Sequence, residues 1–223
     1  MIKLKNVSKY FPKGNVNAVQ NVSFTINDNE IFALLGPNGA GKTTTMRMLA
    51  TLSMPTNGEI WYDNLPTASR NNEKIKKKIG FLTTELRLDG QFTPNQLADF
   101  YGNLYGMTKE QIDENKKHLF EYFGITKFAD RQYESFSTGM KQKTSIAICL
   151  IHDPDVIIFD EPTNGLDVLS QNLVERYLLM LKKRGKCVII STHILDVAQR
   201  LADRIGIIID GKIIYCGTWQ KLV

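Results

Sequence analysis

Short apolar runs separated by turn residues characterise the first third of the chain. Residues 31–35 are all apolar, and residues 22–26 alternate between polar and apolar side chains. A continuous apolar run is typical of a strand buried on both faces, and alternation is typical of a half-buried strand. Helical spacing follows at residues 43–52, and turn residues at 55–58 lead into a further strand at 59–62. The pattern predicts a strand, a glycine-rich loop and a helix in succession.

The apolar spacing changes to three and four residues in the middle of the chain. This spacing is typical of helices. It places apolar side chains at Leu97, Phe100, Tyr101 and Leu104, and then at Ile112, Leu119, Phe120 and Phe123. We therefore predict that residues 94–154 are largely helical.

Strand-like runs return in the last third of the chain. Residues 156–160 and 187–191 are short apolar runs separated by a helical stretch at 169–184, which is the spacing of neighbouring strands in a parallel sheet. Residues 205–216 read as two strands joined by an Asp-Gly pair, which is typical of a β-hairpin. With the first third, these elements predict an α/β fold built on a parallel sheet.

The composition excludes several classes of protein. With 223 residues, 43% of them hydrophobic, 16 glycines and 7 prolines, the chain can bury a core and has too little glycine and proline for a collagen-like or disordered protein. No apolar run approaches the roughly 18–20 residues that span a bilayer, so we expect no membrane-spanning segment. The separated cysteines Cys149, Cys187 and Cys216 lie in apolar surroundings, which predicts reduced core thiols.

The net charge of +5 is a weak sign of an anionic partner. The densest basic run, residues 74–78, contains no aromatic or arginine residue. We interpret it as a solvated helix face rather than a nucleic-acid site, and we expect no nucleic acid among the partners.

A glycine-rich loop lies between the first buried strand and the following helix. It consists of Gly36, Pro37, Asn38, Gly39, Ala40, Gly41, Lys42 and Thr43, followed by Thr44, and it matches the pattern GxxxxGK[ST]. Glycines allow backbone N–H groups to converge on an anion, and the next helix adds the positive end of its dipole. Lys42 would reach the β- and γ-phosphates of a nucleotide, and the Thr43 hydroxyl would bind Mg²⁺. The loop therefore predicts a nucleoside triphosphate site.

Two carboxylates, Asp160 and Glu161, end the apolar strand at 156–160. Because parallel strands present their carboxyl ends at one edge of the sheet, we expect Asp160 beside the glycine loop, as a partner of Mg²⁺ through a water. Glu161 is then placed to orient and deprotonate the water that attacks the γ-phosphorus. Two acids at a strand end can also form a solvated turn, but Lys42 and Thr43 favour the catalytic interpretation.

Further motifs follow in a fixed order. Residues 135–142, Ser-Phe-Ser-Thr-Gly-Met-Lys-Gln, open a predicted helix before Asp160; Asn-Gly-Leu-Asp follows at 164–167, and His193 comes after the next strand. In this order the sequence resembles the ATP-binding subunits of ABC transporters over essentially its whole length.

The resemblance implies a fold. It is a single ABC ATPase domain over residues 1–223, with a P-loop NTPase core of the RecA-like type, an antiparallel β subdomain and an α-helical subdomain. The core with its β subdomain would occupy residues 1–84 and 154–223, and the helical subdomain, which bears the signature, residues 85–153.

The resemblance also implies a head-to-tail dimer. Each ATP would lie between the glycine loop of one subunit and the signature of the other, at Ser137, Thr138, Gly139 and Met140. Taken alone, Ser137 reads more readily as a helix N-cap. Asp167 resembles the loop acid that communicates between the two sites, and His193 resembles the switch histidine that contacts the γ-phosphate.

An aromatic residue near the N-terminus stacks on adenine in this family. We assign this role to Phe11, in a Lys-Tyr-Phe sequence expected to precede the first sheet, with Tyr10 as the competing residue. An aromatic at this position could equally belong to the core.

The sequence departs from the family pattern after the strand expected at 79–82. The family usually has a glutamine there, which touches the metal and the attacking water and links the site to the transporter interface. Here Thr84 occupies its position and Glu85 follows. Either residue does part of that work, or the coupling contact is altered.

The signature departs from the family pattern as well. Phe136, Thr138 and Met140 stand where leucine, glycine and glutamine are usual. Ser137 and Gly139 are retained, and in the family they lie closest to the phosphate. We therefore expect a working site.

The chain is expected to bind ATP and Mg²⁺ and to hydrolyse the ATP. The hydrolysis would drive export through a separate transmembrane permease subunit. The chain would pair with a second copy or with a related ATP-binding subunit, in the cytoplasm at the inner face of the cell membrane. The wording of the motifs resembles the branch of sodium-, drug- and antibiotic-exporting ATPases, so the cargo stays open between sodium, a drug, an antibiotic peptide and a lipid. A small-molecule kinase and a soluble ABC ATPase acting on nucleic acid or ribosomes are the alternatives.

Overall fold

The computed structural model describes residues 1–68, 72–83 and 88–222. The chain divides into two compact units, each described here by itself. The first unit comprises Met1–Ile79, Asp155–Glu161 and Leu178–Val223; the second comprises Gly80–Pro154 and Pro162–Tyr177.

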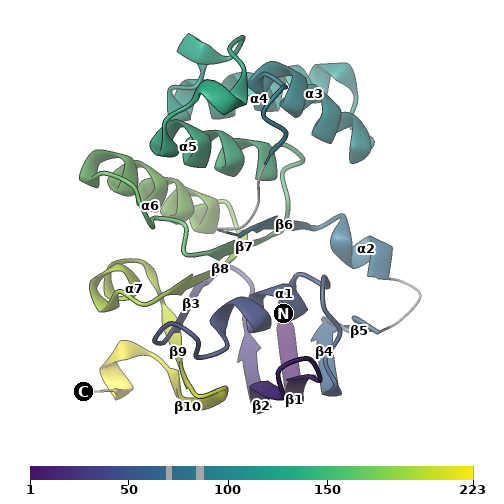
Figure 1. Cartoon of the computed structure of the whole chain (residues 1–223), viewed down its shortest axis with the longest axis vertical. Coiled ribbons are helices and arrows are strands. Elements are labelled where there is room, and N and C mark those ends of the chain that lie inside the picture. The colour runs from purple at the N-terminus through teal and green to yellow at the C-terminus, as the bar shows by residue number, and fades with distance from the viewer. Residues whose placement is uncertain (69–71, 84–87, 223) are drawn as a thin grey trace. The chain divides into compact units, whose positions relative to one another are not determined.

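A mostly parallel sheet forms the centre of the first unit (Figure 1). Its strands within this unit run in the order β10-β9-β3-β8-β7, with β3 parallel to both β8 and β9 and β7 parallel to β8. All residues of β3, β7 and β8 are buried, which explains their continuous apolar runs. The strands are β3 (Ile31–Leu35), β7 (Val156–Asp160), β8 (Cys187–Thr192), β9 (Arg204–Ile209) and β10 (Lys212–Gly217).

The hairpin predicted at the end of the chain is confirmed as β9 and β10, which pair antiparallel around a turn at Asp210 and Gly211. Both turn residues have positive φ, 47° and 75°, which is the conformation that an Asp-Gly turn favours. The strand at 31–35 is confirmed as well, and so is the strand at 156–160.

A second sheet of the first unit is antiparallel, in the order β2-β1-β4-β5. Its strands are β1 (Ile2–Phe11), β2 (Val16–Ile26), β4 (Asn57–Tyr62) and β5 (Leu65–Pro66). The backbone N–H of Gln20 on β2 donates to the carbonyl of Gly211 at 2.8 Å, and its side chain donates to the carbonyl of Asp210 at 3.0 Å. These bonds join the antiparallel sheet to the β9–β10 turn.

The prediction that the Lys-Tyr-Phe sequence precedes the first sheet is wrong. Tyr10 and Phe11 are the last residues of β1, paired with Asn17 and Val16 of β2. The early alternation of β1 is interrupted by irregular register near Val7 and Lys9. Such an interruption hides a strand from a pattern based on a period of two residues.

In the described part of the first unit, the α-helices are α1 (Lys42–Leu49), α2 (Asn72–Lys76) and α7 (Leu195–Leu201). Helix α1 ends three residues earlier than the predicted helix at 43–52, because Thr51 turns the chain with a φ of 61°. The lysines of the run at 74–78 are exposed, two of them on α2 and two directly after it. A short 3₁₀ helix, η3 (Trp219–Lys221), lies near the end of the chain.

The second unit is helical, as predicted for residues 94–154. It contains α3 (Pro94–Leu104), α4 (Lys109–Phe123) and α5 (Thr138–Cys149), with the 3₁₀ helices η1 (Thr126–Phe128) and η2 (Tyr133–Ser135). Thr93 and Thr108 begin α3 and α4 with reciprocal capping boxes. Gly124 ends α4 in the left-handed conformation.

Two elements extend across the boundary between the units along the chain. Strand β6 (Ile79–Leu82) begins in the first unit and ends in the second, and α6 (Val168–Lys183) begins in the second and ends in the first. No helix within residues 1–68, 72–83 and 88–222 is long and apolar enough to span a membrane.

The three cysteines are free thiols, as predicted. Only Cys187 is fully buried, whereas Cys149 and Cys216 are partly exposed. The prediction of core thiols is therefore right for Cys187 and too strong for the other two.

Candidate functional site

The glycine-rich loop joins β3 to α1 and leaves no room for side chains at two of its glycines. A Cβ at Gly36 would lie 2.2 Å from the carbonyl oxygen of Ile208, and one at Gly41 would lie 2.3 Å from that of Ala18. Gly41 also has a φ of 101°. Gly39 has a φ of 81°, but a Cβ there would meet no atom within 4 Å. Gly36 and Gly41 therefore allow close backbone contacts, whereas Gly39 lies at an open part of the loop.

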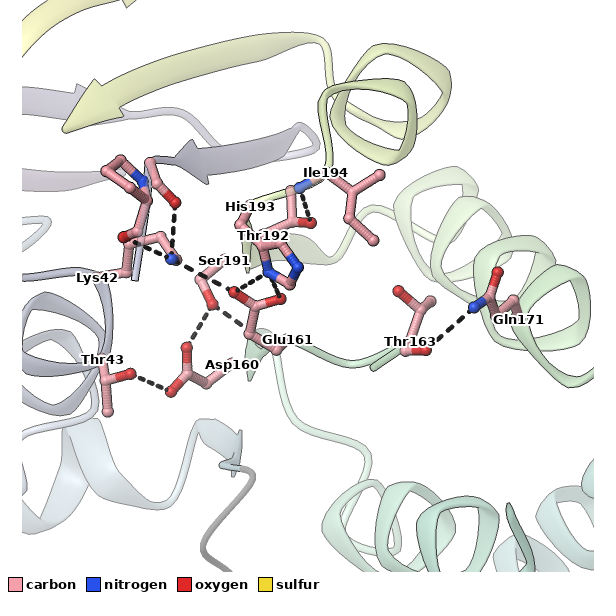
Figure 2. A network of polar contacts seen from close by, with 12 residues as sticks. Lys42, Thr43, Asp160, Glu161, Thr163, Gln171, Ser191, Thr192, His193 and Ile194 are labelled. Atoms are coloured by element: carbon pink, nitrogen blue, oxygen red, sulfur yellow. Dashed lines mark hydrogen bonds and ion pairs between the residues drawn. The ribbon is translucent and has the colours of Figure 1, made fainter. Parts of the chain in front are cut away.

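Lys42, the first residue of α1, folds back over this loop (Figure 2). Its side chain is 6% exposed, and its ammonium donates to the carbonyls of Gly36 at 2.8 Å and Pro37 at 3.1 Å. The same ammonium lies 3.4 Å from Oε1 of Glu161. The cation is therefore held inside the loop, where an anion would bind.

Asp160, the last residue of β7, lies beside the loop as the sequence predicts. The residue is 1% exposed, and its Oδ2 accepts a hydrogen bond of 2.7 Å from the Thr43 hydroxyl. Its Oδ1 accepts a short hydrogen bond from the hydroxyl of Ser191 on β8. This contact explains how a carboxylate is tolerated at a buried strand end.

The pair Thr43–Asp160 fits Mg²⁺, because hydroxyl and carboxylate oxygens are the hard donors that this ion prefers. In the described part of the chain, no group of three or more His, Cys, Asp and Glu side chains could hold a metal ion. At nucleotide sites Mg²⁺ usually takes few protein ligands and several phosphate and water oxygens, so a pair such as Thr43 and Asp160 suits it.

Glu161 follows β7 in a left-handed conformation, with a φ of 53°. This conformation is uncommon for a residue other than glycine. The Glu161 carboxylate lies near the Lys42 ammonium and near the His193 ring (Figure 2). Nδ1 of His193 is 3.0 Å from Oε1 and 2.9 Å from Oε2 of Glu161. The structure thus brings together Lys42, Thr43, Asp160, Glu161 and His193, all in the first unit.

The signature residues belong to the second unit. Ser137 is the N-cap of α5, and its Oγ accepts a hydrogen bond of 3.3 Å from the backbone N–H of Met140. Ser137 and Thr138 are exposed, and Gly139 and Met140 are half-buried. Phe136 is buried against Phe128, with ring centroids 4.8 Å apart. The aromatic at this departure from the family pattern is therefore a packing residue.

The loop that contains Asp167 is fixed by two glutamine side chains of the second unit. Gln142 of α5 donates to the carbonyl of Pro162 at 3.1 Å, and Gln171 of α6 donates to the carbonyls of Thr163 and Leu166 at 3.4 and 3.0 Å. Figure 2 shows the bond between Gln171 and Thr163. The path of this loop is therefore held along its length.

Asp167 itself caps α6. Its two carboxylate oxygens accept hydrogen bonds from the backbone N–H and the hydroxyl of Ser170, at 3.0 and 2.8 Å. The bond from this backbone N–H is the main reason that the pKa of Asp167 lies below its usual range. Asp167 is therefore ionised at neutral pH and held by its two hydrogen bonds from Ser170.

The two candidate adenine-stacking aromatics are equally accessible. Tyr10 is 37% and Phe11 39% exposed. The Tyr10 hydroxyl donates to Oδ1 of Asn15 at 2.9 Å, and the Lys9 ammonium lies 5.2 Å from the centroid of the Phe11 ring. The choice between Tyr10 and Phe11 stays open, and the predicted roles of Thr84 and Glu85 lie outside the described residues.

Sequence reasoning gave no role to Ser191, Gln142 or Gln171, although Gln142 ends the motif at residues 135–142. Their partners lie 31, 20 and 8 or 5 residues away in the chain. The residues themselves are ordinary polar residues at the end of a strand and on two helices. Only the pairing of strands and the packing of helices gives them a role.

Comparisons with known proteins identify the family of the chain. Residues 19–164 match the family model described as ABC transporter. The chain is 40% identical over 225 residues to the ABC transporter ATP-binding protein NatA of Bacillus subtilis (strain 168), covering 100% of this chain and 91% of NatA. It is 36% identical over 222 residues to the Nod factor export ATP-binding protein I of Burkholderia lata, covering 100% of this chain and 72% of that protein.

Solved structures with a similar fold are also ATP-binding subunits or cassettes of ABC transporters. An ATP-binding subunit of an ABC transporter superposes with a TM-score of 0.91 at 26% identity, covering 100% of this chain and 91% of that one. A dimeric post-hydrolysis state of the ATP-binding cassette MJ0796, bound to ADP and Pi, gives 0.89 at 29% identity, covering 98% of both chains. The predicted fold class is confirmed. The chain belongs to the ABC transporter family and is an ATP-binding subunit with ATPase activity.

Proposed function

We propose that the cluster in the first unit is the hydrolytic site, with Glu161 as the general base. The observation that carries this proposal is the position of the Glu161 carboxylate, which lies 3.4 Å from the Lys42 ammonium and 2.9 Å from Nδ1 of His193. The loop from Gly36 to Thr44 cradles the phosphates of ATP with backbone N–H groups, and Lys42 leaves its carbonyl partners to bind the β- and γ-phosphates.

In the hydrolytic step, a water oxygen attacks the γ-phosphorus while Glu161 takes a proton from that water. The bond from the γ-phosphorus to the β–γ bridging oxygen breaks, and its electron pair leaves with ADP, so the products are ADP and phosphate. Lys42 offsets the charge that develops on the phosphate oxygens. His193 holds the Glu161 carboxylate and contacts the γ-phosphate.

Thr43 and Asp160 are the residues that would hold Mg²⁺. Their oxygens face each other at 2.7 Å at the start of α1 and the end of β7. When bound, the ion supplies positive charge that neutralises the β- and γ-phosphates.

The dimer is part of the proposal. The signature residues Ser137, Thr138, Gly139 and Met140 of one subunit contact the ATP that is bound to the loop of the other. In support, Ser137 and Thr138 are exposed at the N-terminus of α5, where N–H groups can meet phosphate, and the similar cassette MJ0796 was solved as a dimer. The loop of Asp167 communicates between the two sites.

The division into subdomains remains a proposal too, with the nucleotide core and β subdomain in residues 1–84 and 154–223 and the helical subdomain in residues 85–153.

Closure of the dimer on ATP would move an associated permease, and hydrolysis would reopen the dimer. A relative is named for Nod factor export and another, of Bacillus subtilis, for linearmycin resistance, which supports export. The cargo is a sodium ion, a drug, an antibiotic peptide or a lipid, and the chain acts in the cytoplasm on the permease at the inner face of the membrane.

The variant Glu161→Gln tests the assignment. It should bind ATP with parental affinity, turn over at least 100-fold more slowly because the general base is lost, and form an ATP-dependent dimer in size-exclusion chromatography. The matched control is Glu121→Gln on the exposed face of α4, which should leave turnover unchanged. Hydrolysis by Glu161→Gln at the parental rate would contradict the proposed base.

A further inference from the structure

Ser191 contacts both acidic residues of the proposed site through one hydroxyl. It lies in β8 and is 0% exposed. Its Oγ donates to Oδ1 of Asp160 and accepts a hydrogen bond of 3.0 Å from the backbone N–H of Glu161 (Figure 2). A serine hydroxyl has a single proton. Because this proton is used in the bond to Asp160, the Ser191 oxygen can only accept in its bond with the Glu161 N–H.

The Ser191 bond completes the support of the Asp160 carboxylate. One carboxylate oxygen receives the Thr43 hydroxyl and the other receives the Ser191 hydroxyl. With a donor on each oxygen, the carboxylate plane cannot rotate without breaking a buried hydrogen bond. The orientation of Asp160 toward the loop therefore depends on β8 as well as on α1.

Ser191 also holds the turn at Glu161. The backbone N–H of Glu161 is shared between the Ser191 hydroxyl at 3.0 Å and the Ser191 carbonyl at 3.3 Å. This N–H belongs to the residue with a φ of 53°, a conformation that needs support from its surroundings. The turn directs the Glu161 carboxylate toward Lys42 and His193.

We propose that Ser191 is a positioning residue for ATP hydrolysis, which sets the orientation of Asp160 and the direction of Glu161 through the two bonds of its hydroxyl. The inference rests on the proposed roles of these two acids. Ser191 touches neither nucleotide nor water in this scheme, so its loss should slow the chemical step and leave ATP binding intact.

The test compares Ser191→Ala with Ser191→Thr in the purified chain of 223 residues. The alanine variant should lower kcat by about 10- to 100-fold, the effect of displacing a reacting group, while the Kd of a fluorescent ATP analogue changes less than about threefold. The threonine variant keeps the hydroxyl and should restore kcat to within about threefold. Should its added methyl impair folding, Ser191→Cys, which has a weaker donor, should fall between serine and alanine.

The matched control for the loss of a buried hydroxyl is Ser145→Ala. Ser145 is buried in the second unit and pairs with the Tyr133 hydroxyl at 3.0 Å. This variant should lower the melting temperature to a similar extent and keep the parental kcat. A merely structural role of Ser191 would make the two alanine variants behave alike, and that result would overturn the inference.

Two further outcomes separate the inference from the proposed function. Parental kcat in Ser191→Ala together with a silenced Glu161→Gln would refute the role of Ser191 and leave the hydrolytic site intact. Parental turnover in Glu161→Gln would refute the proposed site itself. Loss of ATP affinity in Ser191→Ala in proportion to kcat would also overturn the inference, because it would indicate a collapsed site.

Discussion

The side chain of Gln142 donates a hydrogen bond of 3.1 Å to the carbonyl of Pro162. Gln142 lies on α5, the helix that Ser137 caps, and Pro162 directly follows Glu161 in the chain. The signature helix is thus bonded to the first residue of the loop that leads to Asp167. A displacement of either segment would strain or break this bond.

Replacing Gln142 by methionine should uncouple these two segments. Methionine is close to glutamine in size but cannot donate to the Pro162 carbonyl. We expect kcat to fall by about 3- to 30-fold, because net hydrogen-bond contributions of about 0.5–1.5 kcal/mol are typical and a misplaced loop adds to the loss. ATP affinity should stay within about threefold.

The control for this prediction is Lys143→Met, one position further on α5. Lys143 is half-buried and also an internal helix residue, so it tests the effect of methionine in this helix. Steady-state ATPase assays and nucleotide titrations should separate the two variants. Equal kcat values in both would show that the bond to Pro162 has no part in turnover.

The glycines of the phosphate loop provide a second test. Gly41→Ala should lose measurable ATP binding and destabilise the chain by several kcal/mol, because its Cβ would lie 2.3 Å from the carbonyl oxygen of Ala18 at a φ of 101°. Gly39→Ala meets no neighbour within 4 Å, so only the positive φ opposes it, at a cost of roughly 1–2 kcal/mol. Urea unfolding of both variants measures the difference, and equal destabilisation would argue against the steric contact.

The sequence predicts those parts of the site that are encoded locally. The loop from Gly36 to Thr43 is a contiguous motif. The apolar residues of the run at 156–160, which ends at Asp160, are enough to predict a buried strand. The place of Ser191 depends instead on the parallel pairing of β7 with β8, which aligns Asp160 with Ser191 across 31 residues. Such a register cannot be read from a pattern in either strand.

The end of β1 shows the same limit from another side. Tyr10 and Phe11 are paired with β2 although irregular register interrupts the alternation before them. Backbone hydrogen bonds to a neighbouring strand, rather than apolar periodicity, make these residues part of the sheet. A pattern that relies on alternation therefore does not recognise this strand, and it places Tyr10 and Phe11 outside the sheet.

The buried thiol of Cys187 predicts a loss of stability at alkaline pH. Burial raises the pKa of Cys187 to about 12, whereas an exposed thiol has a pKa of about 8.5. The folded chain thus retains a proton that the unfolded chain releases. The contribution of this group to stability is complete below pH of about 8.5 and decreases as the pH rises toward about 12.

Urea unfolding at several pH values between about 8 and 10.5 measures this effect. The free energy of unfolding should decrease with pH in the parent and decrease less steeply in Cys187→Ala. Cys216→Ala is a suitable comparison, because the Cys216 thiol is partly exposed. A pH slope that does not change on removal of Cys187 would contradict the prediction.

The choice between Phe11 and Tyr10 can be decided by removing each ring. The Tyr10 hydroxyl is bonded to Asn15 and its backbone N–H to the Thr56 hydroxyl, at 2.9 and 3.1 Å, so Tyr10 is tethered to the antiparallel sheet. The Phe11 ring has the Lys9 ammonium as a neighbour. Base–aromatic stacking is worth about 1–3 kcal/mol per base. Phe11→Ala should therefore raise the Kd of ATP by about 5- to 100-fold and leave the melting temperature nearly unchanged. Tyr10→Ala should keep the parental Kd and lose some thermal stability, and the reverse pattern of affinities would assign the adenine contact to Tyr10.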